Sequence, residues 1–169
     1  MTSISAHGTR SFGRTVALLV VCALVFAACS GDTTTRDDDG EIIEGGEIDV
    51  FEVQEGDCLL LPSATNEVSS FEGVACDEPH DGEIYELFDI TGFDDYPGDE
   101  IVSAQADEGC FNAFEPFIGL EYAQSAFFVQ QFVPNEQTWN DRDDREVICI
   151  VVPAPGEPQL TMSLEGIAQ

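Results

Sequence analysis

Short stretches of apolar residues, separated by turns, recur along the chain and predict the strands of a small sheet. The connections between the early stretches are too short for crossover helices, so we predict antiparallel pairing. The stretch at 145–152 is apolar on both faces, which is typical of a central strand covered by a helix. Ile84, Phe88 and Ile90 are expected on one face of their strand. The predicted strands are 58–61, 68–76, 83–90, 126–133, 145–152 and, from its strict alternation, 160–165.

A longer stretch between residues 99 and 119 has the apolar spacing of a helix. Asp99 is predicted to cap its first turn, and Pro116 and Gly119 are predicted to end it. A turn or single helical turn is expected at 135–141, around the lone Trp139. The apolar stripe is predicted to contain Ile101, Ala104, Cys110, Phe111, Phe114, Phe117 and Ile118. Residues 50–169 are therefore predicted to form an α+β domain, a small antiparallel sheet with one main helix packed on a face.

The first 28 residues have the pattern of a secretory signal. They contain Arg10 and Arg14, no acidic residue, and an apolar run from residue 16 to residue 28. The run ends in Ala27-Ala28-Cys29-Ser30, which resembles a bacterial lipobox, so we predict that Cys29 is lipidated after cleavage. Cleavage without lipidation, which would give a secreted protein, and an uncleaved helical anchor are the alternatives. Residues 29–49, rich in aspartate and glycine, are predicted to be an acidic flexible tether.

The part of the chain after the predicted signal is strongly acidic. All 34 acidic residues lie there, only three arginines oppose them, and the formal net charge of that part is therefore −31. Such a charge repels phosphate backbones and excludes nucleic acid as a partner. It also repels anionic lipids, so the lipid on Cys29 is expected to provide the membrane attachment. The acidic surface serves either a cation or basic partner, or solubility, and we favour the second because the acids are dispersed.

Four cysteines remain after the predicted signal and the lipid site are set aside, namely Cys58, Cys76, Cys110 and Cys149. In an exported chain we expect them to form disulfides, and of the three pairings we prefer Cys58–Cys76 with Cys110–Cys149, which do not cross. The close cysteine pairs of a zinc site are absent from the sequence.

Taken in order, these landmarks resemble the septum formation family of bacterial envelope proteins. The residues that carry the resemblance are Gly56-Asp57-Cys58, Cys76-Asp77-Glu78-Pro79-His80, Glu83, Cys110, Phe114, Gly119, Pro134, Trp139, Arg145, Cys149 and the segment 160–164. The resemblance implies an extracytoplasmic domain, typically a lipoprotein or membrane-tethered, and a link to cell division. It implies no catalytic residues.

Four residues are candidates for function: His80, Glu83, Trp139 and Arg145. A histidine beside the carboxylates of Asp77, Asp81 and Glu83 has the composition of an acid–base or metal site, although a structural role is favoured. Arg145, like Arg142, stands among aspartates and is expected to form local ion pairs rather than to meet an anionic partner. Calcium binding by Asp94, Asp95, Asp99 and Glu100 is a weaker hypothesis, since their spacing matches no known calcium loop.

These observations favour a lipid-anchored extracytoplasmic domain that binds or scaffolds another component of the cell envelope, in a role related to septum formation. The expected partners are the membrane, through Cys29, and an envelope protein or cell-wall component. No catalytic residue, cofactor or metal is assigned. The alternatives are an envelope hydrolase that uses His80 and neighbouring carboxylates, and an acidic surface domain that responds to cations.

Overall fold

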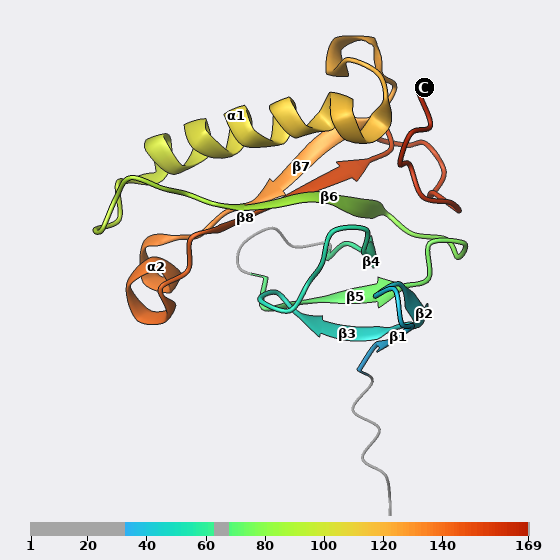
Figure 1. The fold of residues 1–169 in the computed structure, drawn as a ribbon, viewed down its shortest axis with the longest axis horizontal. Coiled ribbons are helices and arrows are strands. Elements are labelled where there is room, and N and C mark those ends of the chain that lie inside the picture. The colour runs from blue at the N-terminus through green and yellow to red at the C-terminus, as the bar shows by residue number, and fades with distance from the viewer. Residues whose placement is uncertain (1–32, 63–67, 169) are drawn as a thin grey trace, which may run out of the picture.

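The computed structural model describes residues 33–62 and 68–168. Its helices and strands are arranged as in Figure 1, with one long helix above a curved sheet. The elements are β1 (Thr35–Arg36), β2 (Ile42–Glu44), β3 (Gly46–Asp49), β4 (Cys58–Leu60), β5 (Ser70–Val74), β6 (Gly82–Asp89), α1 (Asp99–Ile118), a 3-10 turn (Tyr122–Gln124), β7 (Phe128–Phe132), α2 (Glu136–Arg142) and β8 (Glu146–Val152). The predicted α+β class is confirmed.

A six-stranded antiparallel sheet forms the body of the domain, with the strand order β3-β5-β4-β6-β8-β7. The sheet curls so that β3, β5 and β4 lie below β6, β8 and β7 in Figure 1. The rings of Phe71 in β5 and Phe132 in β7 meet edge to face, with centroids 5.0 Å apart. Strands that are not neighbours in the sheet are therefore in contact across its concave side.

Two apolar clusters stabilise this arrangement, one on each side of the sheet. On the convex side, α1 packs against β6, β8 and Trp139. On the concave side, Ile48, Leu59, Phe71, Ile84 and Ile150 pack together between the two halves of the curl. The strand β8 contributes to both clusters, which confirms the prediction that it is covered on both faces.

The helix α1 buries a narrower stripe than its sequence predicts. Its buried residues recur at every fourth position: Val102, Ala106, Cys110, Phe114 and Ile118. Ile101 and Phe111, which were predicted to lie on the stripe, have exposed fractions of 40% and 42%. The helix also lies so close to β6 that a Cβ atom on Gly109 would be 2.2 Å from the Phe88 ring. Contact with a twisted sheet, rather than average apolar spacing, therefore selects the buried face.

One of the two predicted ends of α1 is confirmed and the other is not. Gly119 ends the helix as expected, in a left-handed conformation with φ of 83°, and its N–H donates to the carbonyl of Glu115. The prediction that Asp99 caps the start is wrong, because Gly98 occupies that position and Asp99 is the first helical residue. Its carboxylate accepts a hydrogen bond from the hydroxyl of Tyr96 instead. Pro116 lies inside the last turn rather than beyond it.

A bulge in β6 changes which side chains share a face. Ile84 is opposite Ile150 and Glu86 is opposite Cys149, so Tyr85 is an extra residue in the ladder. Ile84 consequently belongs to the concave cluster, whereas Phe88 and Ile90 pack on the helix side. The prediction that these three residues lie on one face is therefore wrong.

The C-terminal segment is a strap rather than the predicted strand. Of residues 160–165 only Leu160 pairs in a ladder, through a single bridge to His80. Leu160 and Leu164 are buried, but Met162 between them is 57% exposed, so strict alternation does not match burial. Beyond the strap, the N–H of Gly166 donates to the carbonyl of Phe117 at the end of α1.

The folded unit begins earlier than the predicted boundary at residue 50. Residues 33–49, which the sequence assigns to the tether, form three strands, and β3 is an edge of the main sheet. Ile42 and Ile48 are buried, with exposed fractions of 7% and 4%. The predicted signal peptide and Cys29 lie outside the described residues. Within residues 33–62 and 68–168, no helix is long and apolar enough to cross a membrane.

Both predicted disulfides are confirmed. Cys58–Cys76 joins β4 to the turn after β5, and Cys110–Cys149 joins α1 to β8. The second bond fastens the main helix to the strand beneath it. Such bonds are typical of proteins outside the cytoplasm.

Candidate functional site

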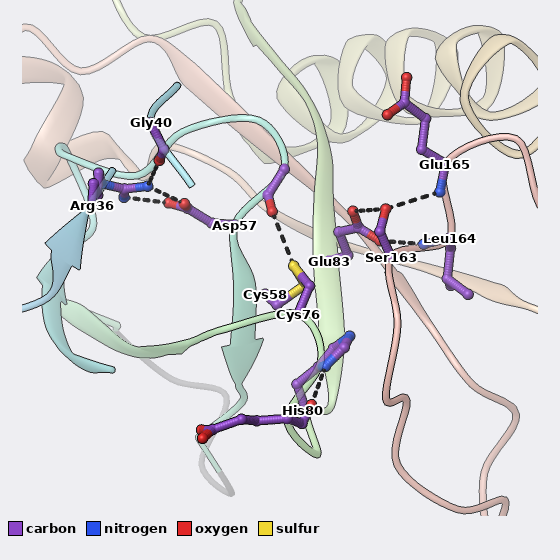
Figure 2. Close-up of a disulfide and its surroundings, with 12 residues drawn as sticks. Arg36, Gly40, Asp57, Cys58, Cys76, His80, Glu83, Ser163, Leu164 and Glu165 are labelled. Atoms are coloured by element: carbon purple, nitrogen blue, oxygen red, sulfur yellow. Dashed lines mark hydrogen bonds and ion pairs between the residues drawn. A yellow bond between two sulfur atoms is a disulfide. The ribbon is translucent and has the colours of Figure 1, made fainter. Parts of the chain in front are cut away.

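Glu83 lies at the start of β6, beside the Cys58–Cys76 disulfide (Figure 2). Its exposed fraction is only 2%. One carboxylate oxygen accepts a hydrogen bond from the Ser163 hydroxyl at 2.7 Å, and the other accepts one from the backbone N–H of Leu164 at 2.6 Å. Glu83 therefore fastens the C-terminal strap to the sheet.

Burial dominates the electrostatics of this carboxyl group. It raises the pKa of Glu83, while the hydrogen bonds from Ser163 and Leu164 lower it and the nearby charge of Glu165 raises it. The carboxylate and the sulfur atoms of Cys58 and Cys76 lie within 4.8 Å of one another. Because the two sulfurs are bonded to each other, they are not thiolates, and the oxidised group lacks the ligands of a metal site.

His80 is also buried, with no exposed surface. Its Nδ1 atom lies 2.8 Å from the carbonyl oxygen of Glu78, which can only accept, so Nδ1 carries the hydrogen. In the described part of the chain, no hydrogen bond or ion pair joins its ring to Asp77, Asp81 or Glu83, and Nε2 has no partner. Asp81 instead accepts from the N–H of Leu61. The structure thus does not assemble the acid–base group that the sequence suggests.

The raised pKa of Glu83 predicts a dependence of stability on pH. Relative to the wild type, the free energy of unfolding of Glu83→Gln should rise as the pH increases from 4.5, the ordinary pKa of a glutamate. The reason is that Glu83 holds its proton more tightly in the folded wild type than in the unfolded chain. The stability of the wild type therefore falls as the pH rises, until the pH exceeds the pKa of Glu83 in the folded state. Glutamine keeps the shape of the protonated group and does not titrate.

Urea unfolding of both proteins from pH 4 to pH 8 measures this difference. Glu157→Gln, which removes one negative charge at an exposed position, is the matched control for the loss of charge. A difference for Glu83→Gln that shrinks with pH would mean that the hydrogen bonds from Ser163 and Leu164 outweigh the cost of burial.

Trp139 and Arg145 form a second group, which joins α2 to the loop before α1. Trp139 is 1% exposed, and its indole N–H donates to the carbonyl of Asp94 at 3.2 Å. The guanidinium group of Arg145 lies 3.7 Å from the centroid of the Trp139 ring and donates to the Trp139 carbonyl at 3.0 Å. It also forms an ion pair with Asp143 at 2.9 Å. These contacts favour a structural role for both residues, in which they hold α2 against the loop before α1.

The acids proposed for calcium do not converge on one point. In the described residues, the only cluster of three or more groups close enough to share a metal is the one around Glu83. The backbone carbonyl of Asp94 accepts from Trp139, and the carboxylate of Asp99 accepts from Tyr96. The structure therefore does not bring Asp94, Asp95, Asp99 and Glu100 together.

An ion pair between Arg36 and Asp57 was not predicted from the sequence. Asp57 is 2% exposed, and its two carboxylate oxygens accept hydrogen bonds from the two terminal nitrogens of the Arg36 guanidinium group (Figure 2). The distance from Nη2 of Arg36 to Oδ2 of Asp57 is 2.7 Å. It also accepts from the N–H of Gln54 at 2.8 Å. The available signal was that Arg36 is the only arginine or lysine between Arg14 and Arg142.

A cleft of about 840 Å³ opens between the two ends of the curled sheet. It is bounded by the end of β3 and the residues that follow it, the residues just before β5, the strand β7, the helix α2 and the start of β8. Phe51, Phe132 and Ile148 contribute apolar surface, and Arg142 and Glu146 contribute charge. Burial, followed by the charges of Asp89 and Asp144, raises the pKa of Glu146. The volume is in the range of small-ligand and peptide sites.

Comparison with known proteins gives one family. No curated protein and no solved structure matches the chain. A model of the family described as Septum formation matches residues 55–168, a segment that contains both disulfides, Glu83 and the strap. Because this match covers more than half of the sequence, the chain belongs to the Septum formation family.

Proposed function

We propose that this chain is a lipid-anchored extracytoplasmic domain that binds another component of the cell envelope during septum formation. The family supplies the septal context, because its description links the domain to that process. The observation that supports binding is the cleft between the two ends of the sheet, which is large, open and lined by aromatic, amide and charged groups. Such a combination of apolar area and a few polar groups is typical of recognition sites.

The burial of the acid–base candidates supports the same proposal over a hydrolase. Both oxygens of Glu83 accept hydrogen bonds from the strap, and the ring of His80 is enclosed. Neither residue lines the cleft. A group that fastens the fold and does not face an open surface is poorly placed to exchange protons with a substrate.

A lipid on Cys29 would hold the domain close to the membrane. The described fold begins at residue 33, only four residues after Cys29. Four residues span at most about 14 Å when fully extended. The proposed anchor therefore acts through a short connection, and not through the longer tether that the sequence suggested.

The localisation of the protein in living cells tests this proposal. A fluorescent protein that folds outside the cytoplasm is joined to the C-terminus through a long linker, since Ala168 still contacts the end of α1. We expect enrichment at division sites, and longer cells when the gene is deleted. Cys29→Ala should move the protein from the membrane fraction to the medium. Uniform distribution together with normal cell length would contradict a septal role.

A further inference from the structure

The cleft lies between the two edge strands of the sheet. β3 and β7 are the first and last strands in the sheet order. Within the described residues β7 pairs with β8 alone, whereas Glu47 of β3 also forms a single bridge with Thr33. An edge strand presents unpaired N–H and C=O groups that can pair with another extended segment. β7 contributes Gln130, Gln131 and Phe132 to the cleft, and the side-chain amide of Gln131 also donates a hydrogen bond to Asp107 on α1.

The floor of the cleft is apolar. Ile148 belongs to the concave cluster, and Phe132, Val50 and Val68 are partly buried and pack against it. Phe51 remains 42% exposed and Val133 39% exposed at the rim. Apolar side chains that alternate along a bound strand would therefore find apolar surface here.

The charge of the cleft is negative. Asp49, Asp144 and Glu146 line it, and Arg142 is the single basic residue opposite them. In the described ranges none of these three carboxylates forms an ion pair, and Arg142 lies over the ring of Phe51 instead. The pKa of Glu146 is raised partly by Asp89 and Asp144, a repulsion that a bound cation would relieve.

We propose that the cleft binds an extended, basic peptide segment of another envelope protein, which pairs with the free edge of β7. This inference rests on the proposed function and names the partner of the same site. In the bound state, apolar side chains of the segment lie on the floor, and its lysine or arginine side chains lie near Asp144 and Glu146. A second copy of this chain is a poor occupant, because each copy has a formal net charge of −29.

Peptide binding to the protein purified from the envelope of expressing cells tests the proposal. The probe is a fluorescein-labelled nonapeptide of alternating lysine and valine, and fluorescence anisotropy gives its Kd. We expect saturable binding, slower amide exchange in residues 128–132, and weaker binding at high salt. A peptide of alternating glutamate and valine should not bind. A lysine–valine peptide with alternate backbone nitrogens methylated should bind at least about tenfold more weakly, because it cannot complete a strand ladder.

Matched variants locate the site. Asp144→Asn with Glu146→Gln should weaken binding by about tenfold, because the charges nearest the peptide are removed. Asp38→Asn with Glu157→Gln changes the net charge equally at exposed positions outside the cleft and should change Kd less than about twofold. Thermal unfolding of both variants checks that the fold is retained.

Equal weakening by the two double variants, or equal binding of the methylated peptide, would overturn the proposal. The first result would mean attraction to the general negative field, and the second would mean binding without strand pairing. A dimer that excludes the peptide would identify a second copy as the occupant and would also overturn it. Peptide binding without septal enrichment in cells would support the peptide site and contradict the septal role. The two proposals can therefore be rejected independently of each other.

Discussion

A chain that begins at residue 50 is expected to be much less stable than one that begins at residue 33. The shorter chain lacks β3 and the buried side chains of Ile42 and Ile48, each worth about 1.5–3 kcal/mol. It also leaves the buried carboxylate of Asp57 without its partner Arg36, which should cost about 3 kcal/mol. This value is the lower end of the range for breaking a buried ion pair, and we use it because Arg36 is partly exposed. Together these losses approach the whole stability of a small domain. Urea unfolding followed by circular dichroism measures the difference.

Substitution of Asp57 gives this prediction an internal control. In the longer chain, Asp57→Asn should destabilise the fold because it breaks the pair with Arg36. In the shorter chain the same substitution should stabilise it, because it removes a buried charge that has no partner. Identical unfolding midpoints for the two chain lengths would show that residues 33–49 contribute nothing, as a tether would.

Replacement of both Cys110 and Cys149 by alanine is expected to cost about 4 kcal/mol, on the loop-entropy estimate for a separation of 39 residues. The melting temperature should fall by on the order of 10 °C or more. The effect is large because the bond joins α1 to β8 in the middle of the convex cluster. Differential scanning calorimetry of the variant and the wild type measures it.

The other disulfide provides the comparison. The Cys58–Cys76 bond closes a shorter separation of 18 residues, so replacing both cysteines should cost about 3 kcal/mol. Mild reductant should also attack Cys58–Cys76 first, because Cys76 is partly exposed whereas Cys110 and Cys149 have no exposed surface. Alkylation followed by mass spectrometry gives the order of reduction. Earlier release of Cys110 and Cys149 would mean that α1 separates readily from the sheet.

Much of the fold was predictable where local pattern and burial coincide. The stretch at 145–152 is apolar on both faces, and β8 is indeed covered on both. The preferred cysteine pairs followed from connections that do not cross, and both are present. Trp139 predicted a short helical turn, and α2 surrounds it with a capping box formed by Asn135 and Thr138.

The errors arose where contacts between distant segments override local composition. Residues 33–49 are acidic and contain few apolar groups, yet Ile42 and Ile48 complete a core supplied by other strands. The bulge at Tyr85 moves Ile84 to the opposite face, and a count of alternating residues cannot show this. The segment 160–165 alternates as a strand does, but its partners are single groups, namely His80 and Glu83.

The candidate site was only partly visible in the sequence. Glu83 and His80 were singled out as candidates for function, and both are buried. Their contacts are with Leu164, Ser163 and Glu78, which the sequence does not link to them. The cleft could not be predicted at all, because it depends on how far the sheet curls. Its walls come from segments as distant as Phe51 and Ile148.

The C-terminal strap also sets the order in which the domain can be completed. Glu83 accepts its bond from Leu164, which follows it by 81 residues in the chain. Synthesis from the N-terminus produces β6 long before the strap, so this corner stays open until the last residues have been added. Contacts over such separations form slowly. A chain cut short before residue 160 would therefore leave His80 and Glu83 uncovered, because both contact the strap.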